Sequence, residues 1–185
     1  MHLEVESTVI LFCLIGGIYG YNQLTLYYPV AKVIQEDQRN EGIQIDLHYE
    51  HYVLGSALVY DLTNVSNDKT AADVFRVFLQ SAKKLSSHHF EKVVISFRGK
   101  SKFYIDGDYF NELGIQFGEQ NPIYTIRTFP QNIHDLNGKK AFETWEGGIF
   151  GVLKEQMDDF NEFNKMWYLN ELGIKNTMKL PETDL

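Results

Sequence analysis

The pattern of hydrophobic and polar positions divides this chain into two parts, of which the first is a long stretch without charge. Between Ser7 and Ala31 no Asp, Glu, Lys or Arg occurs, and residues 9–21 are almost wholly apolar. A helix rises about 1.5 Å per residue, so roughly 20 mostly apolar residues cross the hydrocarbon core of a bilayer. The span from Thr8 to Tyr28 has this length and predicts a single-pass membrane anchor.

Three other interpretations of this stretch compete with an anchor. A cleaved secretory signal needs a basic start and small residues at its cleavage site, whereas residues 1–7 are acidic and Tyr19 stands at the best exit. Lipid attachment at Cys13 needs small residues just before the cysteine, where Phe12 stands. The third interpretation, a buried helix of a soluble protein, stays open because polar residues from Asn22 onward weaken the second half of the span.

The flanks of the span bear on its orientation and partners. The positive-inside rule counts Lys and Arg near the ends of a span, and here only Lys32 and Arg39 follow it. This puts the globular part in the cytoplasm, although two charges leave the side open. Gly16 and Gly20 lie on one helix face, where small residues allow two membrane helices to approach closely. The expected partners are therefore membrane lipid and a second copy of the anchor, and the protein partner stays unknown.

After Pro29 the pattern changes to the short periods of a globular domain. Short alternating or continuous apolar runs predict strands, and apolar residues that recur every three or four positions predict helices. The expected strands are 43–53, 57–62, 92–97, 102–105 and 123–129. The expected helices are one that begins at Thr70, a short one at 109–114 and a long one at 148–169.

The helix that begins at Thr70 has the clearest signature. Thr70 and Asp73 have the spacing of a capping box, with Asp in place of the usual Glu. Its expected buried stripe consists of Val74, Phe75, Phe78, Leu79, Ala82 and Leu85. Further on, the sequence Asp106-Gly-Asp108 predicts a turn with Asp108 as the N-cap of the short helix.

The order of these elements predicts an α+β fold with a mixed sheet and helices packed mainly on one face, as a two-layer sandwich. The helix from Thr70 is expected to connect two buried strands as a crossover. The expected organisation is an anchor segment at 1–31, a polar connection at 32–42, one globular domain at 43–172 and a polar tail at 173–185. About 130 residues without an internal repeat are typical of one domain.

Charge and cysteine content exclude some partners. The chain carries 25 acidic and 17 basic residues, for a net charge of −8, and its basic residues are scattered. This is not the basic footprint that nucleic acid requires, so no nucleic-acid partner is expected. Cys13 is the only cysteine, which makes an intrachain disulfide impossible.

A possible metal site is suggested by His48, Glu50 and His51, which offer nitrogen and oxygen ligands close together. Strand geometry argues against it, because His48 and Glu50 would point to one face of a strand and His51 to the other. The expected site therefore holds no metal and no other cofactor.

Two function classes remain. The first is a non-enzymatic, membrane-tethered interaction or assembly module, which agrees with the anchor, the acidic charge and the lack of a convergent catalytic motif. The alternative is a small membrane-bound enzyme of hydrolase type. Its site would gather four charged residues at strand ends, where α/β-type folds commonly place ligands. These candidates are Asp61, Arg98, Asp106 and Arg127.

Overall fold

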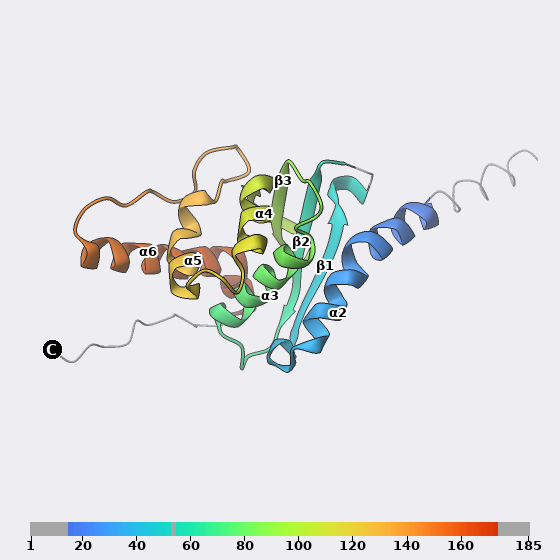
Figure 1. Ribbon diagram of the computed structural model, residues 1–185, viewed down its shortest axis with the longest axis horizontal. Coiled ribbons are helices and arrows are strands. Elements are labelled where there is room, and N and C mark those ends of the chain that lie inside the picture. Colours follow the sequence, from blue (N-terminus) through green and yellow to red (C-terminus); the bar gives the residue numbers. More distant parts are fainter. Residues whose placement is uncertain (1–14, 53–54, 174–185) are drawn as a thin grey trace, which may run out of the picture.

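The computed structural model describes residues 15–52 and 55–173, which form an α+β fold around one four-stranded sheet (Figure 1). Its strands are β1 (Ile43–Tyr49), β2 (Ala57–Val65), β3 (Lys92–Phe97) and β4 (Lys100–Asp106), in the spatial order β1-β2-β3-β4. The central pair, β2 and β3, is parallel, and both outer pairs are antiparallel. The predicted α+β class and mixed sheet are confirmed.

Helical segments account for most of the remaining chain. A helix at residues 15–22 continues through the π-helical turn η1 (Gln23–Tyr27) into α2 (Tyr28–Glu36). The longer helices that follow are α3 (Ala71–Lys84), α4 (Gly107–Gln116), α5 (Pro122–Thr128) and α6 (Ile149–Asn164). Short helical segments are η2 (Gln38–Asn40), η3 (Glu50–Tyr52), η4 (Pro130–Asn132), η5 (Lys165–Leu169) and α7 (Asn170–Leu172).

The clear signature of α3 is confirmed. The Thr70 hydroxyl accepts a hydrogen bond from the Asp73 N–H (3.2 Å), and the Asp73 carboxylate accepts one from the Thr70 N–H (2.9 Å). This reciprocal capping satisfies two backbone donors that the first turn leaves without partners. All six residues of the predicted stripe are buried. Because α3 lies between the parallel strands β2 and β3 in the chain, it is the connection that lets them run in the same direction.

The hydrophobic core lies between one face of the sheet and the helices. Alternate residues of β2 contribute Leu58, Tyr60 and Leu62 to this core, whereas Asp61 points to the opposite face. The centre of the core is aromatic, since the ring of Phe78 lies 4.9 Å from that of Tyr60 and 5.6 Å from that of Phe129. Such ring pairs add about 0.5–1.5 kcal/mol beyond the burial of their area.

Each edge strand of the sheet has a hydrogen-bonded contact with another part of the chain. At β1, the Asn22 side chain accepts a hydrogen bond from the Tyr49 N–H (2.7 Å). At β4, Tyr104 and His134 exchange two backbone hydrogen bonds of 3.0 and 2.9 Å.

The strand expected at 123–129 is wrong, because this segment is the helix α5. The Asn121 side chain caps its start by accepting a hydrogen bond from the Ile123 N–H (2.9 Å), and Pro122 occupies a first-turn position that suits proline. Ile126 and Phe129 are buried and lie three positions apart, which is a helical spacing. Ile123, in the first turn, is exposed. The β-branched residues of 123–129 favour a strand, but the N-cap residue Asn121 and the first-turn Pro122 outweigh that propensity.

The helix α4 begins earlier and ends later than the predicted range 109–114, and glycines explain both differences. Asp106, not Asp108, is its N-cap residue, and the first helical residue is Gly107. A Cβ at Gly107 would lie 1.8 Å from the Phe90 carbonyl oxygen, so only glycine fits this approach. Gly114 does not end the helix, which runs to Gln116. A Cβ there would lie 2.4 Å from the Ala82 carbonyl oxygen, so Gly114 lets α4 cross closely over α3.

The N-terminal segment differs most from its prediction. Leu26, Val30 and Ile34 lie in the hydrophobic core, so the second half of the expected span packs against the globular fold (Figure 1). Asn22, which weakened the apolar pattern, holds the helix against the end of β1.

Among residues 15–52 and 55–173, no helix combines the length and apolarity needed to cross a membrane. The predicted transmembrane helix is therefore unsupported in the part that the structure describes. Its first residues, 8–14, lie outside that part, as do residues 174–185 of the expected tail.

Candidate functional site

The face of the sheet opposite the core carries a pair of carboxylates. Asp46 on β1 and Asp61 on β2 are direct cross-strand partners. Asp61 is only 8% exposed, and one of its oxygens, Oδ2, accepts a hydrogen bond from the Gly99 N–H (2.9 Å). The other oxygen, Oδ1, is buried without a hydrogen-bond partner among the described residues. Nearby, the rings of His48 and Tyr52 stack with centroids 4.0 Å apart.

Burial raises the pKa of Asp61, because it disfavours the charged carboxylate. The hydrogen bond from Gly99 lowers that pKa and opposes the shift, and the negative charge of Asp46 raises it further. The pair can therefore retain a proton on Asp61 at a higher pH than an ordinary aspartate would.

The four catalytic candidates lie in different places. Arg98 is in the β3–β4 turn, at the same end of the sheet as Asp61, but its Nε donates to the Thr63 carbonyl (3.3 Å) and its guanidinium lies over the ring of Phe97 (4.9 Å). Asp106 lies opposite Lys92 in the register of β4 and β3, at the other end of the sheet. The six residues of β3 between these ends span roughly 20 Å.

Arg127 is on α5, outside the sheet, and its guanidinium lies over the ring of Tyr124 (5.2 Å). Only Asp61 and the turn that contains Arg98 are thus brought together. Arg127 would lie at a strand end only if 123–129 were a strand, but this segment is the helix α5.

The three metal candidates also have separate partners. His48 makes a hydrogen bond through Nδ1 with the Tyr49 carbonyl oxygen (2.8 Å). Glu50 forms an ion pair with Lys92 (3.1 Å), and His51 is exposed with a positive φ of 58°. Within the described parts of the chain, no group of three or more His, Cys, Asp or Glu side chains is placed to hold a metal ion.

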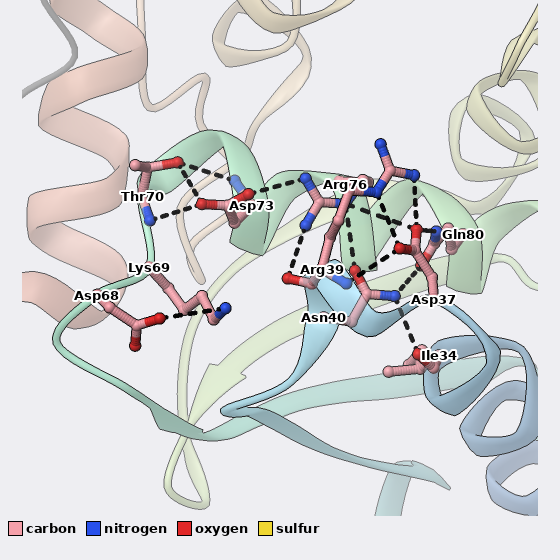
Figure 2. A network of polar contacts seen from close by, with 10 residues as sticks. All are labelled: Ile34, Asp37, Arg39, Asn40, Asp68, Lys69, Thr70, Asp73, Arg76 and Gln80. Atoms are coloured by element: carbon pink, nitrogen blue, oxygen red, sulfur yellow. Dashed lines mark hydrogen bonds and ion pairs between the residues drawn. The ribbon is translucent and has the colours of Figure 1, made fainter.

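A polar network that the sequence did not reveal joins the η2 segment to α3 (Figure 2). At its centre, the Asp37 carboxylate accepts hydrogen bonds from Arg39 Nε (2.8 Å) and Gln80 Nε2 (2.9 Å). Asn40 donates to Gln80 Oε1 (2.6 Å) and accepts from Arg76 Nε (3.2 Å). The hydrogen bonds from Arg39 hold the pKa of Asp37 far below its usual value.

This network holds the segment that connects α2 with β1 against α3. Arg76 spans it, since Nη1 donates to Asp73 (2.8 Å) while Nη2 donates to the Arg39 carbonyl (3.0 Å). Because its charged groups are paired with one another, the arrangement is suited to holding the fold together, not to receiving a ligand. Its members are spread over residues 34–80, and no spacing in the sequence could have identified them as a set.

The helix at residues 15–28 exposes a group of large apolar side chains, which we call the N-terminal apolar surface. Its members are Ile15, Ile18, Tyr19, Tyr21, Leu24 and Tyr28, each between 39% and 69% exposed. A Cβ at Gly16 or Gly20 would meet no atom within 4 Å, so the face that carries these glycines is open. Large apolar side chains exposed along one helix are a feature of surfaces that contact proteins or membranes.

Comparisons of the chain with protein-family models, curated proteins and solved structures found no match.

Proposed function

We propose that this protein is a non-enzymatic interaction or assembly module that attaches to a membrane through its N-terminal helix. The observation that carries the proposal is the N-terminal apolar surface, which continues the uncharged stretch of the sequence that begins after Ser7. Each apolar side chain transferred from water to lipid gains about 25 cal/mol per Å² of buried area. The dispersed catalytic candidates agree with a role in contact instead of chemistry.

The packing of the helix limits how this attachment can occur. Leu26 and Val30 are fully buried in the core, so the helix cannot enter lipid beyond the residues just before them without unfolding part of the domain. From Thr8 to Tyr21 a helix would rise about 21 Å, which is shorter than the hydrocarbon core of about 30 Å. Attachment by insertion into the membrane surface or one leaflet fits this length better than a complete span.

Charge gives the attachment a recognisable signature. The first basic residue of the chain is Lys32, and the net charge is −8, so attraction to anionic lipid does not contribute. Binding should therefore depend on apolar contact and persist at high salt, because salt screens exposed charges but does not weaken apolar burial.

A flotation experiment tests the proposal. The full chain is mixed with phosphatidylcholine vesicles, and we expect it to float with them at both low and high salt. Replacing Ile15, Ile18 and Leu24 together with Asp should abolish flotation. The matched control replaces Ile115 and Ile123, two exposed isoleucines on α4 and the α5 segment, with Asp and should float like wild type. Circular dichroism verifies that both variants are folded, and equal flotation of the two variants would contradict the proposal.

The alternative, a small hydrolase, has one observation in its favour. Asp61 is a buried carboxylate with a raised pKa and an unpartnered oxygen, which are features of catalytic acids and bases. If the protein hydrolyses simple esters such as p-nitrophenyl acetate, Asp61→Asn should remove that activity. Activity that is absent from wild type, or unchanged in Asp61→Asn, would leave no role for Asp61 in hydrolysis.

A further inference from the structure

A hollow of about 280 Å³ lies between α4 and the segment formed by α5 and η4, far in the sequence from the N-terminal helix. We call it the α4/α5 hollow. Tyr109, Glu112 and Gln116 reach it from α4, where spacings of three and four place them on one face. Thr128 and Gln131 contribute from the opposite side. This volume is near the lower end for sites that hold a small organic molecule.

The lining is polar but almost without charge. Amides and hydroxyls predominate, no lysine or arginine contributes, and Glu112 has the only carboxylate among the lining residues. The Glu112 carboxylate already accepts a hydrogen bond from Gln116 Nε2 (2.7 Å). Burial raises the pKa of Tyr109, so its hydroxyl remains a neutral hydrogen-bond group.

Several of these groups have hydrogen-bonding capacity left. The Asn132 amide donates to the Thr128 carbonyl (3.1 Å), and the Gln120 oxygen accepts from the Asn121 N–H (3.0 Å). The Gln131 side chain, in contrast, makes no hydrogen bond with the described residues, and the same is true of Gln116 Oε1 and Gln120 Nε2. The hollow therefore presents both free donors and free acceptors.

The chemistry of these groups selects a class of ligand. Anions are disfavoured because no cationic side chain lines the hollow, and apolar molecules would leave its amides without partners. A hydroxyl group both donates and accepts, which matches side-chain amides that offer both functions. We propose that the α4/α5 hollow is a binding site for a neutral polyhydroxylated ligand of the size of one or two sugar rings. This site is independent of the membrane attachment.

Nuclear magnetic resonance of the ¹⁵N-labelled full chain tests the proposal directly, because the side-chain amide signals of Gln116, Gln120, Gln131 and Asn132 report on the hollow itself. The probes are glucose, galactose, mannose, N-acetylglucosamine, maltose and cellobiose. We expect at least one of them to shift these signals in a saturable way. Glucose 6-phosphate, which adds an anion to the same ring, should bind more weakly than glucose.

Variants connect the signal to the site. Gln131→Ala should weaken binding about fivefold or more, the factor that corresponds to the loss of one ordinary hydrogen bond. The control Gln35→Ala changes an exposed glutamine on α2 and should bind as wild type does. Because the Gln131 side chain has no partner to lose, this variant should fold normally.

Three results would overturn the proposal. They are the absence of shifts with all six sugars, shifts that Gln131→Ala leaves unchanged, and tighter binding of the neutral peptide triglycine than of any sugar. The last result would indicate that the hollow receives peptide groups instead of hydroxyls.

Discussion

The N-terminal helix is apolar along much of its length, but its apolar side chains have two different environments. Residues 15–21 expose apolar side chains, whereas Leu26, Val30 and Ile34 are buried in the core. Between these two groups lies Asn22, whose amide donates to the carbonyls of Ile18 (2.9 Å) and Tyr52 (3.0 Å). Apolar residues of one helix thus lie both outside and inside the core, and a buried polar side chain ties the helix to the rest of the fold.

The largest loss of stability is expected in the hydrophobic core, to which Leu26, Val30 and Ile34 of the N-terminal helix belong. Phe78→Ala should lower the free energy of unfolding by about 3–5 kcal/mol, because it leaves a cavity among the aromatic rings at the centre. Urea denaturation measures this loss. His89→Ala changes an exposed residue of the loop after α3 and should remain within about 0.5 kcal/mol of wild type. A comparable result for Phe78→Ala would mean that the core is misplaced.

Two leucines on the same helix test the comparison itself. Leu26 is fully buried and Leu24 is 69% exposed, although they are two positions apart. Leu26→Ala should cost about 2–5 kcal/mol in the free energy of unfolding, and Leu24→Ala less than about 0.5 kcal/mol. Only Leu24→Ala should weaken vesicle binding without loss of stability. Equal effects on stability would place the boundary of the core in the wrong position.

Asn22 ties the N-terminal helix to the end of β1. Asn22→Ala removes the acceptor for the Tyr49 N–H and should cost about 1–3 kcal/mol, because a buried backbone donor loses its partner. The amide proton of Tyr49 should then exchange faster with solvent. Gln23→Ala, one residue further along the helix, is the control. Unchanged exchange at Tyr49 in Asn22→Ala would contradict the role of this side chain.

Unlike Asn22, Asp61 is a buried polar residue with one oxygen that has no hydrogen-bond partner among the described residues. Asp61→Asn keeps an acceptor for Gly99 and removes a buried charge beside Asp46, so it should raise stability at neutral pH by about 1 kcal/mol. Because the pKa of Asp61 is raised in the folded protein, wild type gains stability as pH falls through that value toward 3.8. The variant should lack this gain in denaturation curves measured across the same pH range. A parallel pH profile for the two proteins would exclude Asp61 as its source.

The smallest effect on folding is expected at the exposed end of the helix. Gly16→Ile and Gly20→Ile introduce side chains into open space and should leave the free energy of unfolding almost unchanged. If two copies associate through this face in the membrane, either change should abolish the association, because it prevents close approach of the backbones. Chemical crosslinking in vesicles measures it, with Ile15→Leu as the control. Association that persists in both glycine variants would exclude this face as the dimer contact.

Local signals predicted the parts of the fold that depend on neighbouring residues. The capping pair Thr70 and Asp73 predicted the start of α3, and the apolar runs at 92–97 and 102–105 predicted β3 and most of β4. The segment 123–129 was misjudged because its apolar residues fit either period, and the decisive contacts came from Asn121 and from the core. Two of the four charged candidates, Asp106 and Arg127, lie away from Asp61, because contacts between distant parts of the chain decide which strand ends meet and make 123–129 a helix.

The sequence by itself determined the α+β class with a mixed sheet, the face of α3 that is buried and the existence of an uncharged N-terminal stretch. These properties follow from periodicity and capping, which act over a few residues. Only the tertiary structure decided that half of this stretch belongs to the core, that Asp46 and Asp61 are partners, and that amides from α4 and η4 line one hollow. Such contacts join residues far apart in the chain, and apolar composition has the same pattern whether its solvent is lipid or a protein interior.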